Sequence, residues 1–162
     1  MYPEIKTILY ATDLGDHMQP VFRFALGVAK KHAAGIVMLH VAEPLSSGMQ
    51  FAINAYMSEV GAKEVLRDGM KKALAKMQQR LDKFCDDELA QSPEDRDLVT
   101  EVKVVSGRPA ETITQQAEQL EADLIVVGTH TDPSFGAQLL GSTARKVTQL
   151  SKIPVLVIPV NE

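Results

Sequence analysis

Five short runs of apolar residues are spread along the 162-residue chain. They cover residues 5–11 (IKTILYA), 35–41 (GIVMLHV), 98–105 (LVTEVKVV), 123–127 (DLIVV) and 154–158 (PVLVI). Four of them are almost continuous in Ile, Val, Leu and Met, which is typical of parallel strands covered on both faces. The run 98–105 instead places Thr100, Glu101 and Lys103 among its valines, which predicts a strand nearer an edge of the sheet.

Amphipathic helical patterns lie between these runs. In residues 19–34 the apolar positions recur at helical spacing, and the stripe consists of Val21, Phe24, Ala25, Val28 and Ala29. A longer pattern over residues 58–84 carries a stripe of Val65, Met70, Ala73, Leu74, Met77, Leu81 and Phe84. Residues 110–121 follow Pro109, which suits a first helical turn, and residues 142–150 follow Gly141.

Strands that alternate with helices predict an α/β protein, namely an open parallel sheet with helices on both faces and right-handed crossovers. The length predicts a single domain over residues 1–162. Two stretches fit neither pattern. Residues 42–55 (AEPLSSGMQFAINA) form a long, irregular connection, and loops of that length are often functional. Residues 86–97 (DDELAQSPEDRD) are acidic and are expected to form a solvated surface linker.

Composition narrows the possible partners and the compartment. Of the residues, 45% are hydrophobic and 23% charged, and 17 basic against 21 acidic residues give a net charge of -4. This balance gives no electrostatic reason to expect nucleic acid or an anionic membrane surface. We expect neither a signal peptide nor a membrane-spanning segment. The single cysteine, Cys85, cannot form an internal disulfide, so a cytoplasmic protein is expected.

Ligands of open parallel sheets bind beyond the carboxyl ends of the strands, where the winding reverses. The candidate pairs at these ends are Thr12-Asp13, Ala42-Glu43, Ser106-Gly107 and Gly128-Thr129, the last followed by His130. Asp13 could accept hydrogen bonds from a ribose diol or cap the next helix. His130 could contact a phosphate or donate to a backbone carbonyl.

The stretch from Gly128 to Val147 reads as a strand, a glycine-flanked loop and a helix. Gly128 would let a ligand approach the backbone closely. Gly141-Ser142 opens a helix whose free N–H groups favour an anion, although this motif by itself is more often an ordinary serine N-cap. No G-x-x-x-x-G-K-[ST] loop and no G-x-G-x-x-G motif after the first run are present. The scattered histidines indicate no metal site.

Several segments together resemble the universal stress protein family, and the resemblance covers nearly the whole chain. The matching segments are ILYATDLGD, VMLHVAEP, VVSGRPAETI, ADLIVVGTH and GSTARKVTQLSKIPVLVIPV. The family's phosphate loop has the form G-x2-G-x9-G-[ST]. Gly128, Gly141 and Ser142 occupy its first, third and fourth positions with the spacing intact.

The resemblance implies a Rossmann-like sheet of order 3-2-1-4-5 that binds an adenine nucleotide, ATP or AMP, with Mg²⁺ as a companion ion. It implies a stress-response module that uses the nucleotide as a signal, with little or no catalysis. It also implies a homodimer formed by antiparallel pairing of the last strand, from Pro154 to Val160. The nucleotide-binding positions carried over are Ala11, Thr12, Asp13, Val41, Val127, Gly128, His130, Thr131, Gly141, Ser142 and Thr143.

One position departs from the family's loop. The second glycine is Thr131 here, and a β-branched residue at a positive φ angle would cost about 1–3 kcal/mol. Asp132 adds like-charge repulsion toward a phosphate, which screening at an exposed loop reduces. These two residues favour an alternative function, a stress-response dimer that binds no nucleotide and acts through protein partners. A third possibility, a weak ATPase, lacks a visible general base.

Overall fold

The structure, a computed structural model, describes residues 1–130 and 140–160, apart from the side chain of His130. The strands are β1 (Thr7–Ala11), β2 (Gly35–Ala42), β3 (Val99–Ser106), β4 (Leu124–His130) and β5 (Val155–Val160). The helices are α1 (Gln19–His32), α2 (Ser47–Tyr56), α3 (Glu59–Leu89), α4 (Pro109–Gln119) and α5 (Ser142–Leu150), with the short 3₁₀ helix η1 (Pro93–Leu98). Every predicted strand and helical pattern is confirmed, with small shifts at the ends.

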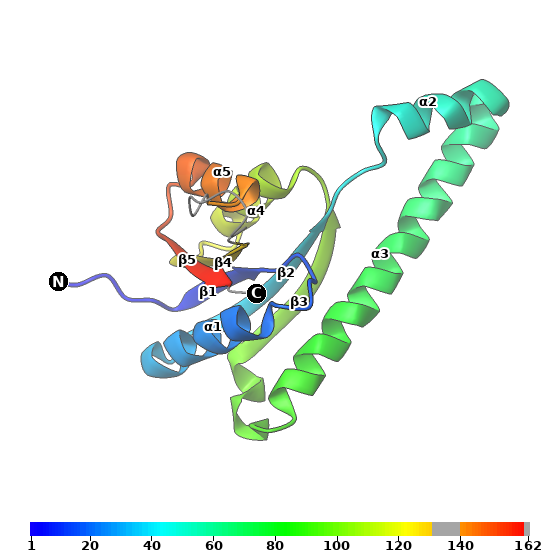
Figure 1. Ribbon diagram of the computed structural model, residues 1–162. Helices are drawn as coiled ribbons and strands as arrows, with labels where there is room; N and C mark the ends of the chain where they lie inside the picture. The colour runs from blue at the N-terminus through cyan, green and yellow to red at the C-terminus, as the bar shows by residue number, and fades with distance from the viewer. Residues whose placement is uncertain (131–139, 161–162) are drawn as a thin grey trace.

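The five strands form one parallel sheet in the order β3-β2-β1-β4-β5, which confirms the predicted topology (Figure 1). The expected edge strand, β3, does lie at one edge. From β1 the chain builds outward through β2 to β3, and it then crosses to the other side to add β4 and β5. The winding therefore reverses between β1 and β4, and a crevice is expected at the carboxyl ends of these two strands.

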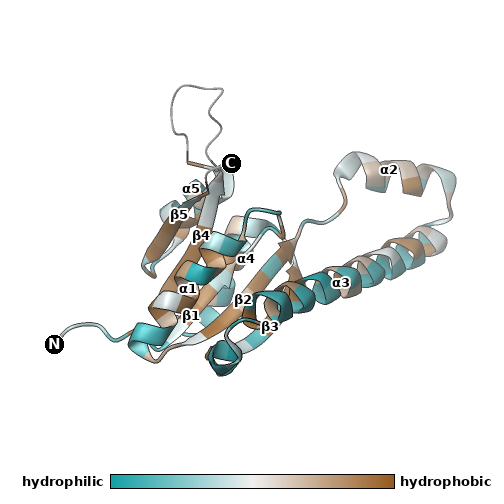
Figure 2. Ribbon diagram, turned by 60° about the horizontal axis from the view of Figure 1, so that its bottom comes forward, coloured by the Kyte–Doolittle hydropathy of each residue, from teal (hydrophilic) through white to brown (hydrophobic). Residues whose placement is uncertain are grey.

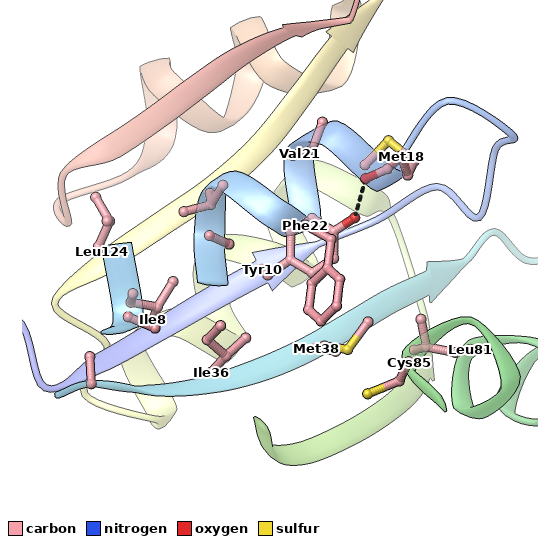
Figure 3. Packing of buried hydrophobic residues seen from close by; sticks show 14 of the residues in the cluster. Ile8, Tyr10, Met18, Val21, Phe22, Ile36, Met38, Leu81, Cys85 and Leu124 are labelled. Carbon is pink, nitrogen blue, oxygen red and sulfur yellow. Dashed lines mark hydrogen bonds between the residues drawn. The ribbon is translucent and has the colours of Figure 1, made fainter. Parts of the chain in front are cut away.

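Helices cover both faces of the sheet, as the continuous apolar runs predicted. On one face, α1 and the C-terminal end of α3 enclose a core that includes Tyr10, Phe22 and Leu81 (Figure 3). On the other face, α4 and α5 cover Leu9, Leu39 and their neighbours. Each fully buried Leu or Phe side chain contributes about 1.5–3 kcal/mol, so the two cores fix the positions of the strand ends.

The buried side of α1 differs from the predicted stripe. Phe22 is fully buried and its ring centroid lies 5.5 Å from that of Tyr10, whereas Phe24 is 51% exposed. The inward positions are Val21, Phe22, Ala25 and Ala29. A helix buries positions spaced three and four apart, and both Phe22 and Phe24 satisfy part of that spacing. Phe22 and not Phe24 is the buried residue because its ring packs against Tyr10.

The 31-residue α3 is longer than the sheet it covers. Its C-terminal end packs on β3 and buries Leu81, Cys85 and Leu89, while its N-terminal half extends away from the sheet (Figure 1). At about 1.5 Å per residue the helix spans roughly 46 Å. Val65, predicted to be part of the buried stripe, is 46% exposed because this half of α3 has no sheet beneath it.

Both irregular stretches were predicted incorrectly. Residues 42–55 contain most of α2, which begins where the Ser46 hydroxyl accepts a hydrogen bond from the backbone N–H of Met49 at 3.3 Å. Residues 86–97 begin as the last turn of α3, where Leu89 is only 2% exposed, and continue into η1. Across the described ranges, none of the helices combines the length and apolarity needed to cross a membrane.

Candidate functional site

A cavity of about 400 Å³ opens at the carboxyl ends of β1 and β4, where the winding of the sheet reverses. Strand ends, loops and three helices contribute to it. Its walls are formed by Ala11, Thr12, Asp13, Met18, His40, Val41, Ala42, Glu43, Met77, Pro109, Ile113, Val127, Gly128, Thr129, Gly141, Ser142, Thr143 and Ala144. A volume of this order is typical of small-molecule sites.

Nine of the eleven predicted site residues line this cavity, although they come from separate parts of the chain. They are Ala11, Thr12, Asp13, Val41, Val127, Gly128, Gly141, Ser142 and Thr143. Of the other two, His130 ends β4 but its side chain is not described, and Thr131 lies outside the described residues together with Asp132. The candidate pair Ser106-Gly107 is not among the lining residues.

The loop after β1 forms a tight turn through side-chain hydrogen bonds. The Thr12 hydroxyl accepts from the backbone N–H of Leu14 at 3.1 Å, and the Asp13 carboxylate accepts from that of Gly15 at 2.8 Å. Leu14 has a φ angle of 62°, which is unfavourable for a residue with a side chain. Asp13 thus stabilises its own turn and does not cap α1, whose N-cap is Met18.

One part-buried and one buried contact hold the ends of this loop. His40 Nδ1 donates to the backbone carbonyl of Thr12 over 2.8 Å, because a carbonyl can only accept. The Tyr10 hydroxyl donates to the carbonyl of Met18 over 3.3 Å (Figure 3). Burial raises the pKa of Tyr10 well above its usual range, so the phenol keeps its proton for this bond. The Asp13 carboxylate is therefore carried on an anchored loop.

The opposite wall is the N-terminus of α5. The backbone N–H of Gly141 donates to the Thr129 hydroxyl over 2.8 Å, which joins the end of β4 to the start of this helix. Gly141 is the N-cap, so Ser142 is the first helical residue and not the N-cap that was the alternative. The first intrahelical bond runs from Arg145 N–H to the Gly141 carbonyl, so the first turn presents unpaired N–H groups and a favourable dipole to an anion.

Gly128 plays a different part from the one expected. It lies within β4, paired with Ile158 of β5, and does not begin the loop. A Cβ atom there would lie 2.9 Å from Val21 Cγ2 and 3.3 Å from both Met18 Sδ and Val160 Cγ2. Close packing of α1 on the sheet thus requires the glycine, irrespective of any ligand.

The cavity is mostly apolar, and its charged groups are acidic. Asp13 and Glu43 are carboxylates, and no lysine or arginine occurs among the lining residues in the described ranges. In the same ranges, no three His, Cys, Asp or Glu side chains lie close enough together to hold a metal ion. An anionic ligand would therefore depend on the backbone N–H groups of α5.

Sequence reasoning missed several lining residues. They are Met18, His40, Met77, Pro109, Ile113 and Ala144. Met77 reaches the cavity only because α3 packs on β3, and no local pattern reports that contact. His40 could have been found, since it lies next to Val41 near the end of a strand that was predicted correctly.

The fold and the cavity together define an α/β protein with a ligand crevice at the switch point of a doubly wound parallel sheet. The model of the universal stress protein family matches residues 4–159. The chain belongs to the universal stress protein family.

Relatives and solved structures agree with this assignment. A Thermus aquaticus protein named "universal stress protein in QAH/OAS sulfhydrylase 3′ region" is 31% identical to this chain. The match covers 94% of this chain and 98% of the relative. The universal stress protein UspA from Lactobacillus plantarum is 25% identical with a TM-score of 0.64, and the match covers 97% and 99% of the two chains. A universal stress protein in complex with cAMP shares the fold at 19% identity and a TM-score of 0.62, over 98% and 100%.

Proposed function

We propose that this protein binds an adenine nucleotide, AMP or ATP, in the switch-point cavity and uses its occupancy as a signal in a stress response, in the cytoplasm and with little or no catalysis. The observation that carries the proposal is the meeting of three features in one cavity. The Asp13 turn, the apolar end of β2 and the N-terminus of α5 face the same space. That cAMP binds a protein of the same fold supports adenine as the base.

The walls suggest how the parts of the nucleotide are arranged. Val41, Ile113 and Met77 give an apolar surface for the base, and the backbone of Val41 can identify it by hydrogen bonds. The Asp13 carboxylate would accept hydrogen bonds from the ribose hydroxyls. The phosphates would meet the free N–H groups at the start of α5, those of Ser142 and Thr143, next to Gly141, whose own N–H is donated to Thr129. Ala11, Thr12, Val127 and Gly128 line the rest of the cavity. The proposed phosphate contacts of His130 and Thr131 rest on the family resemblance alone.

Signalling is favoured over catalysis because two of the lining groups able to move a proton, Asp13 and His40, have structural tasks. The Asp13 carboxylate accepts the Gly15 N–H, and His40 Nδ1 is bonded to the Thr12 carbonyl. Mg²⁺ would accompany the triphosphate and take most of its ligands from phosphate oxygens and water. AMP binding would not need the ion.

Calorimetry with AMP, ATP and adenosine tests the proposal. We expect AMP or ATP to bind with a dissociation constant below about 1 mM, which corresponds to roughly -4 kcal/mol, and adenosine to bind more weakly. The substitution Asp13→Ala removes hydrogen bonds to a charged group worth about 1.5–3 kcal/mol, which weakens binding by roughly 10- to 100-fold. Asp16→Ala is the matched control, since Asp16 is in the same loop but does not line the cavity.

Absence of binding at millimolar AMP and ATP would contradict the proposal. Equal losses in the Asp13 and Asp16 variants would contradict the ribose assignment alone. A phosphate-release assay with Mg²⁺ present tests the absence of catalysis. Turnover clearly above a buffer blank would show an ATPase.

A second candidate function is a stress-response dimer that binds no nucleotide and acts through protein partners. The acidic walls of the cavity favour it, because Asp13 and Glu43 repel phosphates and no described lining residue is basic. Thr131 and Asp132 argue in the same direction. If this candidate is correct, the unaltered chain binds no ATP, and replacing both residues by glycine raises the affinity into the measurable range.

We also propose that the chain forms a homodimer by antiparallel pairing of the last strand, from Pro154 to Val160. β5 is at one edge of the sheet, with β4 as its neighbour. An apolar strand with one unpaired edge favours association with another strand. This pairing would place the two cavities in one particle.

A further inference from the structure

The far end of the α2–α3 hairpin exposes an unusual amount of apolar surface. We call α2 and the N-terminal half of α3, residues 44–76, the arm; it projects away from the sheet (Figure 1). Of the twelve large hydrophobic side chains that are exposed among the described residues, seven belong to it. They are Leu45, Met49, Phe51, Tyr56, Met57, Val60 and Val65.

Among the described residues, no other part of the chain covers this surface of the arm. All of α2 is described, and none of its residues is buried. Phe51 is 75% exposed and Tyr56 is 92% exposed. Apolar and uncharged residues dominate α2, as its pale and brown colouring shows (Figure 2). Clustered apolar surface of this kind marks an interaction site.

The distribution of charge resembles a protein interface. Residues 44–58 contain no charged side chain, and charges return with Glu59 at the start of α3. Interface centres are depleted in charge and enriched in Met, Phe and Tyr, with charged residues at the rim. An anionic membrane would instead require Lys or Arg on the polar side of α2, which has none. A protein surface is thus the better match.

The first charges of α3 fit a second copy of this chain as the partner. The first four are Glu59, Lys63, Glu64 and Arg67, whose signs alternate, and Asp68 follows. Within one chain Lys63 pairs with Glu59 and Arg67 with Asp68, and such exposed pairs are weak enough to be exchanged. Reversing the order of the first four charges inverts every sign. Two copies of the helix placed antiparallel about a two-fold axis can therefore set Glu59 against Arg67 of the second copy and Lys63 against its Glu64. A two-fold interface requires such self-complementarity.

We propose that the arm is a self-association surface, in which the α2 helices of two copies cover each other's apolar residues and the starts of the α3 helices pair antiparallel. This contact involves a region remote from β5 in the fold (Figure 1). It therefore uses no residue of the strand pairing, and none of the residues that line the cavity. Together the two contacts would allow assemblies larger than a dimer.

Sedimentation velocity over a range of concentrations measures the effect of the arm on assembly. We expect the double variant Phe51→Ser, Tyr56→Ser to have a lower mean mass than the unaltered chain at the same concentration. Phe24→Ser is the matched control, an exposed aromatic residue on α1 (51% exposed), and it should leave the mass unchanged. Because all three side chains are exposed, circular dichroism should show that each variant folds.

A charge exchange tests the antiparallel arrangement directly. Arg67→Glu alone sets acidic residues against each other and should weaken association at low salt by about 2- to 5-fold, in keeping with exposed ion pairs. Adding Glu59→Arg to that variant restores opposite charges across the two-fold axis and should restore association. Failure of the second substitution to restore it would overturn the antiparallel pairing.

Covalent capture gives the position of the contact. With Ala55→Cys, an exposed site in α2, a short bismaleimide should link two copies efficiently, whereas Lys31→Cys on α1 should link them poorly. Cys85 is buried and contributes little. The proposal is overturned if the unaltered chain stays monomeric over a roughly 100-fold range of concentration. It is also overturned if the arm variants have the same mean mass as the unaltered chain. Binding of the arm to anionic vesicles or to another protein, without self-association, would overturn it as well.

Discussion

Gly128 shows how one residue can belong to a sequence motif and also serve the core. It is the first glycine of the family's phosphate loop, yet its missing Cβ makes room for Val21, Met18 and Val160. We expect Gly128→Ala to destabilise the fold by about 1–3 kcal/mol, as overpacking does in a close-packed core. Thermal unfolding without ligand measures this effect.

Gly27 provides the matched control for that substitution. It lies in α1, where an added Cβ would meet nothing within 4 Å. Gly27→Ala should stabilise the protein by about 0.5–1 kcal/mol because alanine favours a helix. If Gly128→Ala were equally well tolerated, the glycine would have to be explained by the ligand and not by packing.

At this scale the sequence revealed the part of the site that depends on local order. Asp13 lies just beyond β1, Gly128 is near the end of β4 and Ser142 begins α5, so their positions were predictable. The residues that reach the cavity through packing were not. Met18 and Met77 line it only because α1 and α3 rest on the sheet at particular angles. The role of Asp13 in its own turn also depends on the backbone of the folded loop.

Among the elements, β1 is joined to β4 by a side chain at the end of the sheet opposite the cavity. The Asp123 carboxylate accepts from the backbone N–H groups of Lys6 at 2.8 Å and Thr7 at 2.9 Å. These two bonds, with that of Lys6 the larger cause, hold the pKa of Asp123 below its usual range. The ionised carboxylate therefore fastens the start of the central strand.

Asp123→Ala should lower the free energy of unfolding at pH 7 by about 1 kcal/mol, because two N–H groups lose a charged acceptor that is partly open to solvent. Asp123→Asn keeps one acceptor oxygen, so its free energy of unfolding should lie between those of the unaltered protein and the Asp123→Ala variant. Since the folded-state pKa is depressed, this stabilisation is present above pH 3.8 and is lost as the pH falls below that value. Urea unfolding at pH 7 and at pH 3 measures both effects. A difference that grows in acid would contradict the assignment.

The elements that the sequence predicted are those that bury an apolar face. Each strand of the sheet is a continuous apolar run because both of its faces are covered. α2 was not predicted because none of its residues is buried. Its sequence therefore lacks the periodic contrast between apolar and polar positions that indicates a helix. Its remaining signal is the hydroxyl of Ser46 at the N-cap, and an N-cap alone does not distinguish a helix from a turn.

The whole molecule combines a close-packed body with an arm that has little packing of its own. The body holds both buried clusters, whereas Ala62 is the one buried residue that α3 has before Leu81. Elements with few buried contacts open more often than core elements. The chain is therefore expected to have two regions of different local stability, although α3 runs through both.

Hydrogen exchange measured by mass spectrometry tests this division and links it to assembly. In dilute solution, peptides from residues 47–70 should exchange close to the rate of an unfolded chain, because isolated helices of this size are marginal in water. Peptides from residues 78–89 should be protected by at least about 100-fold, since Leu81, Cys85 and Leu89 are packed in the core.

Raising the protein concentration should slow exchange in residues 47–70 alone, because a second copy would cover them. The Phe51→Ser, Tyr56→Ser variant should lose that concentration dependence and keep the protection of residues 78–89. Protection of the arm that is already complete in dilute solution would mean that it folds against its own chain, and the division would be wrong.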